Sequence, residues 1–319
     1  MIDIAEPSMM AWRVHEFGPP SVMQFERVAR PTAGENEVLV KVAAAGVGPW
    51  DGWIRAGKSA LPQPLPLTLG SDLAGDIVAV GPAVSSFTLG DQIYGVTNSQ
   101  FLGSYAEYAV ASASMISKKP SSLTYIEAAS VPVVAATAWQ ALFDQAKLKA
   151  GQTVLIHGAA GNVGAYAVQL AHQADIRVIA TAAADYIPRI RDLGADTAID
   201  FEAQDFEKEV RDVDAVIDLI GGEVQRRSFQ VLRRGGKLIS AVSQPDQNLA
   251  RLLGIEAAFF LVQVSSQGLA DIADLIDGGK LKTNLGAVLP MADARRAHLM
   301  LENLQPRPNG KIVLVSMTE

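Results

Sequence analysis

The sequence has no cysteine and only four histidines in 319 residues. Without cysteine the chain can form no disulfide bond, thiol nucleophile or cysteine-ligated zinc site. The histidines, at positions 15, 157, 172 and 298, show no metal-ligand spacing. We therefore expect no bound metal, and we expect His157, which ends an apolar run, to be a packed residue rather than a ligand.

The sequence also lacks a basic run and a long apolar segment. Its net charge is -7, which argues against nucleic acid as a partner. The longest uncharged run, residues 128–143, is shorter than the ~20 residues of a membrane helix and contains Pro132. The first 14 residues show no apolar signal core. These absences predict a cytoplasmic protein with no membrane partner.

Among the features that are present, residues 154–171 are the most informative. Residues 154–157 are mostly apolar and predict a buried strand, small residues fill positions 158–161, and a helical pattern follows. A strand, a small-residue turn and a helix in this order predict a dinucleotide-binding loop. A tight turn without a ligand is the alternative, because Ala159 replaces the first glycine of the usual G-x-G-x-x-G pattern.

Two glycines and a helix start give this loop its predicted chemistry. Gly161 lets the backbone approach a pyrophosphate, and Gly164 lets the first helical turn pack against the strand. The helix that begins near Asn162 offers unpaired N–H groups and a partial positive charge.

Strands and helices alternate after this loop. Helical patterns end near Asp196 and Leu232 and cover 205–211, and further strands are predicted at 177–181, 197–200, 214–219, 236–240 and 258–262. This alternation predicts a doubly wound parallel sheet of six strands. We assign the Rossmann domain to residues 126–281; it includes a helical connector at 127–146 and a last helix at 269–276.

The flanking regions follow a different pattern. Short strands are predicted at 37–42, 76–81, 91–96 and 105–110, with glycine and proline dense between them. This is typical of a compact β-barrel-like domain. A helix at 295–303 and a strand at 310–315 are predicted to rejoin it, so we assign residues 1–125 and 282–319 to one discontinuous domain.

Together these features resemble the zinc-independent quinone oxidoreductase branch of the medium-chain dehydrogenase/reductase superfamily. The resemblance covers nearly the whole chain. The stretches that carry it are 44–51, 69–75, 103–108, 137–142, 154–171 and 310–314. It implies an α/β protein with a GroES-like catalytic domain beside the Rossmann domain.

The chain departs from the zinc-dependent relatives at the metal ligands. They carry a cysteine where this chain has Gly48, and a histidine–glutamate pair where it has Ser71 and Asp72. Without zinc, hydride transfer from NAD(P)H to an already electrophilic quinone or α,β-unsaturated carbonyl remains possible. The family often has asparagine at position 48, near the nicotinamide and substrate, so glycine there removes one hydrogen-bond donor. If the cofactor binds without turnover, Gly48→Asn is the first change that we would make to restore this donor.

The predicted cofactor site combines the loop with positions taken from the resemblance. No acid stands at Ala182, where NAD-dependent proteins bind the ribose, but the family's serine and basic partners for a 2′-phosphate are also replaced, so the residues themselves are nearly neutral between the two cofactors. The resemblance favours NADPH, and NADH is possible. Lys311 is alternatively a surface lysine on an edge strand. The cofactor-binding set is Gly48, Thr137, Gly158, Ala159, Ala160, Gly161, Asn162, Val163, Gly164, Thr181, Ala182, Ala183, Tyr186, Ser240 and Lys311.

The predicted substrate side is aromatic. Trp50, Tyr94 and Tyr105, with Trp53, would line the site, and a tyrosine would donate a hydrogen bond; the alternative is that they are core residues. For Asp51 we favour bracing of the preceding loop over proton transfer. The predicted catalytic set is Trp50, Asp51, Tyr94 and Tyr105.

The leading hypothesis is a zinc-independent NAD(P)H-dependent reductase of small electrophilic molecules. The alternatives are a zinc-free alcohol dehydrogenase-like oxidoreductase and a non-catalytic NADP-binding protein of the crystallin or sensor kind. A homodimer is also predicted, because pairing of the apolar strand at 259–264 with its copy would cover an exposed sheet edge.

Overall fold

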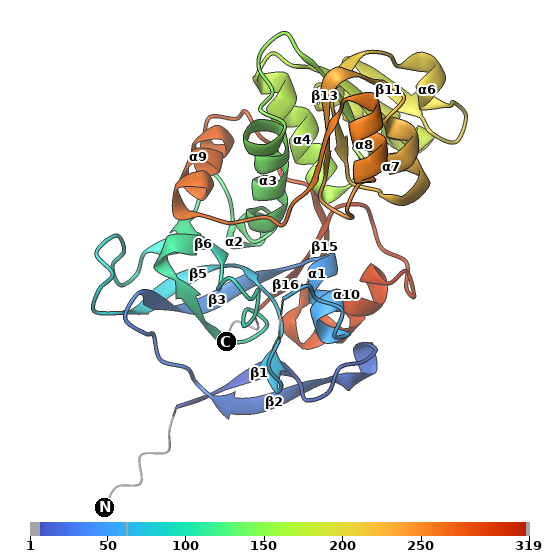
Figure 1. Ribbon diagram of the computed structural model, residues 1–319. Helices are drawn as coiled ribbons and strands as arrows, with labels where there is room; N and C mark the ends of the chain where they lie inside the picture. The colour runs from blue at the N-terminus through green and yellow to red at the C-terminus, as the bar shows by residue number, and fades with distance from the viewer. Residues whose placement is uncertain (1–6, 62, 317–319) are drawn as a thin grey trace, which may run out of the picture. The chain divides into compact units, whose positions relative to one another are not determined.

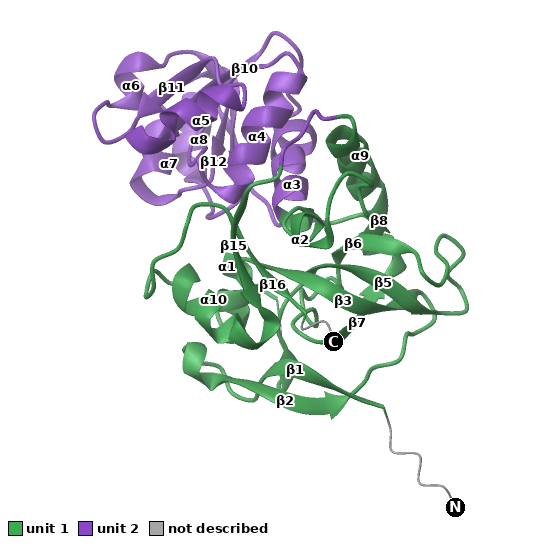
Figure 2. Cartoon of the chain, turned by 180° about the vertical axis from the view of Figure 1, so that it is seen from behind, with its two compact units in different colours: residues 1–133, 264–278, 283–319 green, residues 134–263, 279–282 purple. Residues whose placement is uncertain are grey.

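The computed structural model describes residues 7–61 and 63–316, which form two compact units (Figure 1). Unit 1 comprises residues within 1–133, 264–278 and 283–319, and unit 2 comprises residues 134–263 and 279–282 (Figure 2). The predicted α/β class is confirmed, and one of the two units contains the predicted six-stranded parallel sheet.

Unit 1 is built on two sheets. The smaller sheet has the order β2-β1-β4, and the larger has the order β15-β16-β3-β5-β6-β8 with β7 paired to β3. The strands are β1 Ser8–Val14, β2 Met23–Ala29, β3 Glu37–Val47, β4 Leu67–Thr68, β5 Asp72–Val80, β6 Gln92–Val96, β7 Tyr108–Ser112, β8 Ile116–Lys118, β15 Leu285–Pro290 and β16 Lys311–Val315. The helices are α1 Pro49–Arg55, α2 Tyr125–Ala128, α9 Ser266–Asp277 and α10 Ala294–Leu301.

The central strand of unit 1 shows why the sequence folds this way. In β3, Val38, Val40 and Val42 are buried in the core, and Lys41 is exposed. Leu39, on the same face as Lys41, is buried as well, so the alternation typical of a half-buried strand is confined to the neighbourhood of Lys41. The C-terminal β16 pairs antiparallel with β3, so the tail belongs to unit 1.

Unit 2 contains a six-stranded, entirely parallel sheet with the order β11-β10-β9-β12-β13-β14. The order reverses between β9 and β12, so the carboxyl end of β9 lies at the topological switch point. The strands are β9 Thr153–Ile156, β10 Arg177–Ala182, β11 Thr197–Asp200, β12 Val213–Asp218, β13 Leu232–Ser240 and β14 Glu256–Phe259. The helices are α3 Pro132–Trp139, which begins at the end of unit 1, α4 Asn162–Gln173, α5 Ile187–Asp192, α6 Phe206–Glu209, α7 Gly222–Ser228 and α8 Gln247–Leu253.

The domain boundaries differ from the predicted ones at two segments. Residues 126–133 and 264–278 were assigned to the Rossmann domain but lie in unit 1. The reason is packing: α2 contacts β3 and β5, and α9 contacts β8. A helix pattern in the sequence does not say which sheet the helix covers.

Several elements also have different ends. The connector predicted at 127–146 is divided into α2, α3 and a π-helical segment at Gln140–Gln145. The strand predicted from Tyr105 begins at Tyr108, because Ala106 bridges to Ala11 in β1 instead of continuing the ladder to β3. The strand predicted at 258–262 is β14 and ends at Phe259.

No helix in the described ranges is both long and apolar enough to span a membrane.

Candidate functional site

The loop after β9 is held by backbone hydrogen bonds to both neighbouring strands. The His157 N–H donates to the Ile217 carbonyl of β12 at 3.0 Å, and the Ala159 N–H donates to the Thr181 carbonyl of β10 at 3.2 Å. Gly158 has a φ of +72°, a conformation that favours glycine. The turn is therefore fixed at the switch point of the sheet.

The glycines of this loop leave room for a ligand and for the helix. A Cβ on Gly164 would lie 2.3 Å from the Gly158 carbonyl oxygen, so only glycine fits where α4 crosses the turn. A Cβ on Gly161 would meet only that same oxygen, at 3.2 Å, and Gly161 is exposed. No side chain caps α4 at Gly161. This exposed helix start fits the pyrophosphate of a dinucleotide.

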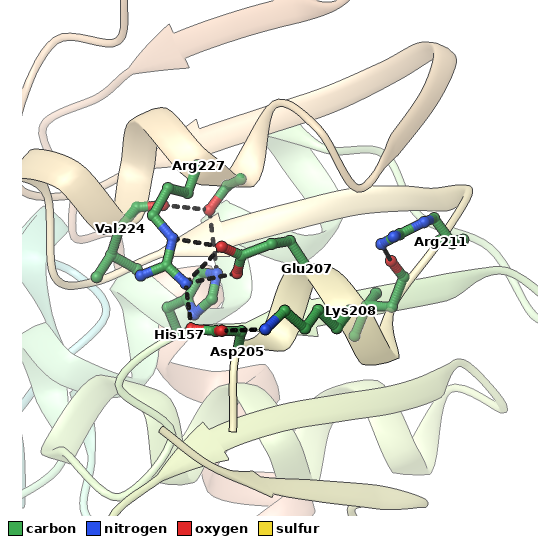
Figure 3. A network of polar contacts seen from close by, with 9 residues as sticks. His157, Asp205, Glu207, Lys208, Arg211, Val224 and Arg227 are labelled. Carbon is green, nitrogen blue, oxygen red and sulfur yellow. Dashed lines mark hydrogen bonds and ion pairs between the residues drawn. The ribbon is translucent and has the colours of Figure 1, made fainter. Parts of the chain in front are cut away.

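His157, which precedes Gly158 in this loop, is part of a network of polar contacts (Figure 3). Its Nδ1 lies 3.0 Å from the Thr181 hydroxyl, and its Nε2 lies 3.0 Å from the Ser228 hydroxyl. Because Ser228 donates to the Val224 carbonyl at 2.7 Å, Nε2 is the donor to Ser228 and Nδ1 accepts from Thr181. Burial lowers the pKa of His157 to about 4, so the ring is neutral. This confirms the prediction of a packed histidine.

An aromatic ring on α6 and an ion pair between α6 and α7 support His157, and Figure 3 shows the ion pair of Arg227 with Glu207. The His157 and Phe206 rings lie 4.6 Å apart between centroids, and the Arg227 guanidinium lies 5.1 Å from the Phe206 ring. Arg227 Nε donates to Glu207 at 2.7 Å. These contacts connect His157 through Phe206 to the partly exposed ion pair of Arg227 and Glu207.

Ser240 does not present its hydroxyl to a ligand as predicted. It is fully buried and donates to Asp218 Oδ2 at 2.8 Å. Asp218 also accepts from the backbone N–H groups of Ile220 and Gly221 and from Gln225. Ser240 and Asp218 therefore fix the ends of β13 and β12.

The end of β10 carries neither an acid nor a cation at the predicted ribose position. Ala182 is buried, and Ala183 and Tyr186 are half-buried. Asp200, at the end of β11, is the register partner of Ala182, and Arg189 is exposed on α5. The local charges are mixed, so this end of the sheet does not itself select between the two dinucleotides.

In unit 1, Asp51 forms the centre of a buried cluster. Its Oδ2 accepts from the Gly48 N–H at 2.8 Å and from the Tyr105 hydroxyl at 2.9 Å. Both Asp51 and Tyr105 are fully buried, so the favoured bracing role is observed and Tyr105 offers no donor to a ligand. Burial raises the pKa of Asp51 to about 7, against the opposing hydrogen bond from Gly48. The pKa of Tyr105 is also raised, by burial and by Asp51.

Lys311 is not a surface lysine. It is 1% exposed, and its Nζ lies 2.6 Å from Oδ2 of the fully buried Asp72. The sequence placed Lys311 on an edge strand, but β15 pairs with β16 on its outer side. The ammonium is committed to Asp72 rather than presented to a cofactor. Asp72 Oδ1 also accepts from the Val133 N–H at 3.2 Å.

The aromatic candidates have different environments. Tyr94 is fully buried and donates to the Leu269 carbonyl at 2.5 Å, so the prediction that it lines a substrate site is wrong. Trp53 is 50% exposed on α1, and Thr137 is buried in α3. Trp50 is half-buried; its Nε1 donates to the Ser71 hydroxyl at 2.9 Å, and Lys311 Nζ lies 4.3 Å from its ring centroid.

Sequence reasoning found the loop but missed this pairing. Ser71 was considered as a departure from a zinc site, and Asp72 also as a residue that braces its own loop; in the structure they hold Trp50 and Lys311. Within residues 7–61 and 63–316, no group of three or more histidine, aspartate or glutamate side chains could hold a metal ion.

Two protein-family models match the chain. "Alcohol dehydrogenase GroES-like domain" matches residues 34–121, and "Zinc-binding dehydrogenase" matches residues 193–314. A quinone oxidoreductase from Lama guanicoe is 33% identical, over 96% of this chain and 97% of its own length. A 2-methylene-furan-3-one reductase from Solanum lycopersicum is 31% identical, over 98% of this chain and 80% of its own length.

Solved structures agree with these matches. The quinone oxidoreductase from Coxiella burnetii superposes with a TM-score of 0.89 and 33% identity, covering 97% of this chain and 99% of that one. Mycobacterial Rv1454c complexed with NADPH gives a TM-score of 0.85 and 30% identity, covering 96% of this chain and 99% of that one.

Proposed function

Because the chain belongs to the quinone oxidoreductase-like branch of the medium-chain dehydrogenase/reductase superfamily, we propose that it reduces quinones or α,β-unsaturated carbonyl compounds with NAD(P)H. The observation that carries this proposal is the glycine-lined start of α4 at the switch point of the parallel sheet. The similarity to a quinone oxidoreductase and to an enone reductase supports the two substrate classes.

The loop and α4 hold the dinucleotide in this proposal. The exposed backbone at Gly161 and the helix start at Asn162 meet the pyrophosphate. Ala182, Ala183 and Tyr186 lie beside the adenosine ribose. NADPH is the preferred form; the NADPH complex of a similar structure supports this, and the mixed charges near Ala182 leave NADH usable. The bound nicotinamide supplies a hydride, and a proton from solvent completes the reduction.

The protein's own contribution on the substrate side is positioning. Gly48 and Trp50 are proposed to face the acceptor, and Asp51 and Tyr105 hold α1 in place from the core. A small electrophilic acceptor needs orientation and exclusion of water more than a strong acid, because its oxygen delocalises the incoming charge.

The test is Gly161→Ala, with Gly52→Ala in α1 as the control. A methyl group at 161 would lie 3.2 Å from the Gly158 carbonyl oxygen, a tight contact that the turn must relieve by a small shift, and the group blocks the approach of a pyrophosphate. We expect the Kd for NADPH to rise at least about tenfold while the protein stays folded, with a melting temperature within a few degrees of wild type. Gly52 has no atom within 4 Å of an added Cβ, so its variant should bind normally.

Turnover separates the competing functions. Oxidation of NADPH with 1,4-benzoquinone or with a simple enone supports the reductase. Tight NADPH binding without turnover of any acceptor would instead indicate a non-catalytic nucleotide-binding protein. An unchanged Kd for NADPH in Gly161→Ala would show that the loop does not contact the cofactor.

Three further features are proposals. A homodimer is supported by the position of β14 at the edge of the sheet, and light scattering that shows a monomer would refute it. Zinc-independent turnover is tested by metal analysis of the active protein. The cytoplasmic location stays a prediction.

A further inference from the structure

Gly48 and Trp50 share one space. A Cβ built on Gly48 would lie 2.3 Å from Cη2 and from Cζ2 of Trp50 and 2.5 Å from its Cε2. All three atoms belong to the six-membered part of the indole. The ring therefore occupies the volume into which a side chain at position 48 would extend.

The orientation of this indole is fixed from two sides. Nε1 donates to the hydroxyl of the buried Ser71 at 2.9 Å. One face of the ring covers Lys311 Nζ, 4.3 Å from the centroid, and that ammonium is held by Asp72 at 2.6 Å. A cation against an aromatic face is attractive, so the contact adds to the hydrogen bond in restraining the ring. Trp50 nevertheless remains partly exposed.

The donors around the indole are committed to the protein. The Gly48 N–H and the Tyr105 hydroxyl both donate to Asp51, and the indole N–H donates to Ser71. An acceptor molecule at Gly48 and Trp50 would therefore contact aromatic carbon atoms rather than a free hydrogen-bond donor. A flat ring system gains more from such a surface than a short chain does, because offset stacking grows with the shared area.

We propose that Trp50 determines substrate specificity, its indole selecting flat polycyclic acceptors, such as ortho-quinones with fused rings, over short linear enones. The inference rests on the proposed function, since it assumes that position 50 faces the acceptor. It gives a physical reason for glycine at position 48: the residue must lack a side chain for the indole to lie there.

This coupling overturns the expectation that Gly48→Asn restores a useful donor. The asparagine side chain and the indole cannot both occupy the space, so Trp50 would have to leave Ser71 and Lys311. A donor at position 48 requires a smaller residue at position 50 as well.

The experiment compares Trp50→Val and Trp50→Phe with Phe17→Val, a change at an exposed aromatic side chain of the same unit. The substrates are 9,10-phenanthrenequinone and the linear enone 3-penten-2-one, each with saturating NADPH. For Trp50→Val we expect KM for the quinone to rise about tenfold, with kcat/KM for the enone within about threefold of wild type. Trp50→Phe should lie between, and Phe17→Val should match wild type.

Equal losses on both substrates, or no loss on the quinone, would overturn the proposal and leave Trp50 with a structural role. The Kd for NADPH, measured for each variant, must stay constant for a KM change to be assigned to the acceptor. A wild-type protein that reduces neither substrate refutes the proposed function. Calorimetric binding of the quinone to wild type and to Trp50→Val then decides whether the indole holds flat rings.

A double-variant cycle tests the shared space independently of activity. Gly48→Asn alone should lower the melting temperature by several degrees, and Gly48→Asn with Trp50→Val should recover most of that loss. If Gly48→Asn alone is as stable as wild type, the indole does not fill the space and the inference is wrong.

Discussion

The candidate regions of the two units, called here the loop half and the cluster half, are built from opposite materials. The loop at 157–164 in unit 2 consists of backbone, small residues and one neutral histidine. The cluster in unit 1 consists of ionisable side chains removed from water: Asp51, Asp72 and Lys311 are each at most 1% exposed. The first half leaves backbone N–H groups for a ligand, whereas the second uses its polar groups on itself.

This difference determines which substitutions disrupt each half. The glycine loop loses its ability to bind a ligand when an added side-chain atom fills the room beside its backbone. Its stability depends little on charged side chains. A buried charge cluster fails when one partner is lost, because the remaining charge stays in a medium that solvates it poorly. The predictions below separate the two halves on this basis.

The largest effect is expected from Lys311→Met. Removing the ammonium leaves Asp72 buried without its partner at 2.6 Å, which should cost about 3–5 kcal/mol of unfolding free energy. Thermal and urea unfolding measure it. The control is Lys237→Met, since the Lys237–Glu256 pair is 3.6 Å apart and its Glu256 side chain is 73% exposed. A loss below about 1 kcal/mol for Lys311→Met would show that the pair does not hold unit 1.

The next effect is a pH dependence carried by Asp51. Its pKa is raised by burial to about 7, above its ordinary value of 3.8, so between these values the folded state holds a proton that the unfolded state has lost. The contribution of Asp51 to stability therefore falls as the pH rises from about 4 to 7, by ~1.4 kcal/mol per pH unit at most. Lys311 opposes the shift, and Asp72 adds to it.

Asp51→Asn removes this slope while its amide oxygen still accepts from Gly48 and Tyr105. The measurement is the unfolding free energy of the variant minus that of wild type across pH 4 to 7. The difference is needed because His298, whose pKa burial lowers to about 3, contributes a slope of the opposite sign to both proteins. Parallel curves for the two proteins would show that Asp51 does not titrate in this range.

The sequence predicts the loop half well because the loop's function is encoded locally. Gly158, Gly161 and Gly164 lie within seven residues, and each permits a conformation or an approach that another residue would block. The doubly wound sheet is predictable for the same reason, since strand and helix periods repeat along the chain.

The charge cluster was not predictable because its partners are distant in sequence. Lys311 and Asp72 are 239 residues apart, and nothing in the neighbourhood of either indicates the other. Lys311 also gives the pattern of a surface lysine until β15 is placed outside β16. Tyr94 is a similar case: its burial depends on α9, a helix that the sequence assigns to the other domain.

The smallest effect, and the sharpest contrast with Asp51, is expected from His157→Leu. The change leaves the hydroxyls of Thr181 and Ser228 without their partner at 3.0 Å and should cost about 1–3 kcal/mol at pH 7. Because burial lowers the pKa of His157 to about 4 from 6.5, the unfolded state binds the proton first as the pH falls. The stability that neutral His157 contributes is thus present above pH 6.5 and is lost toward pH 4.

The cost of His157→Leu should therefore shrink on acidification, and Asp51→Asn should change stability with the opposite sign over the same range. The matched control on α4 is His172→Leu, which changes an exposed side chain and should alter the unfolding free energy at pH 7 by less than about 0.5 kcal/mol. A constant cost of His157→Leu from pH 4 to 7 would mean that the ring is not held neutral by burial. In that case the pH dependence of stability would not distinguish the loop half from the cluster half, and the contrast between them would reduce to one of backbone geometry.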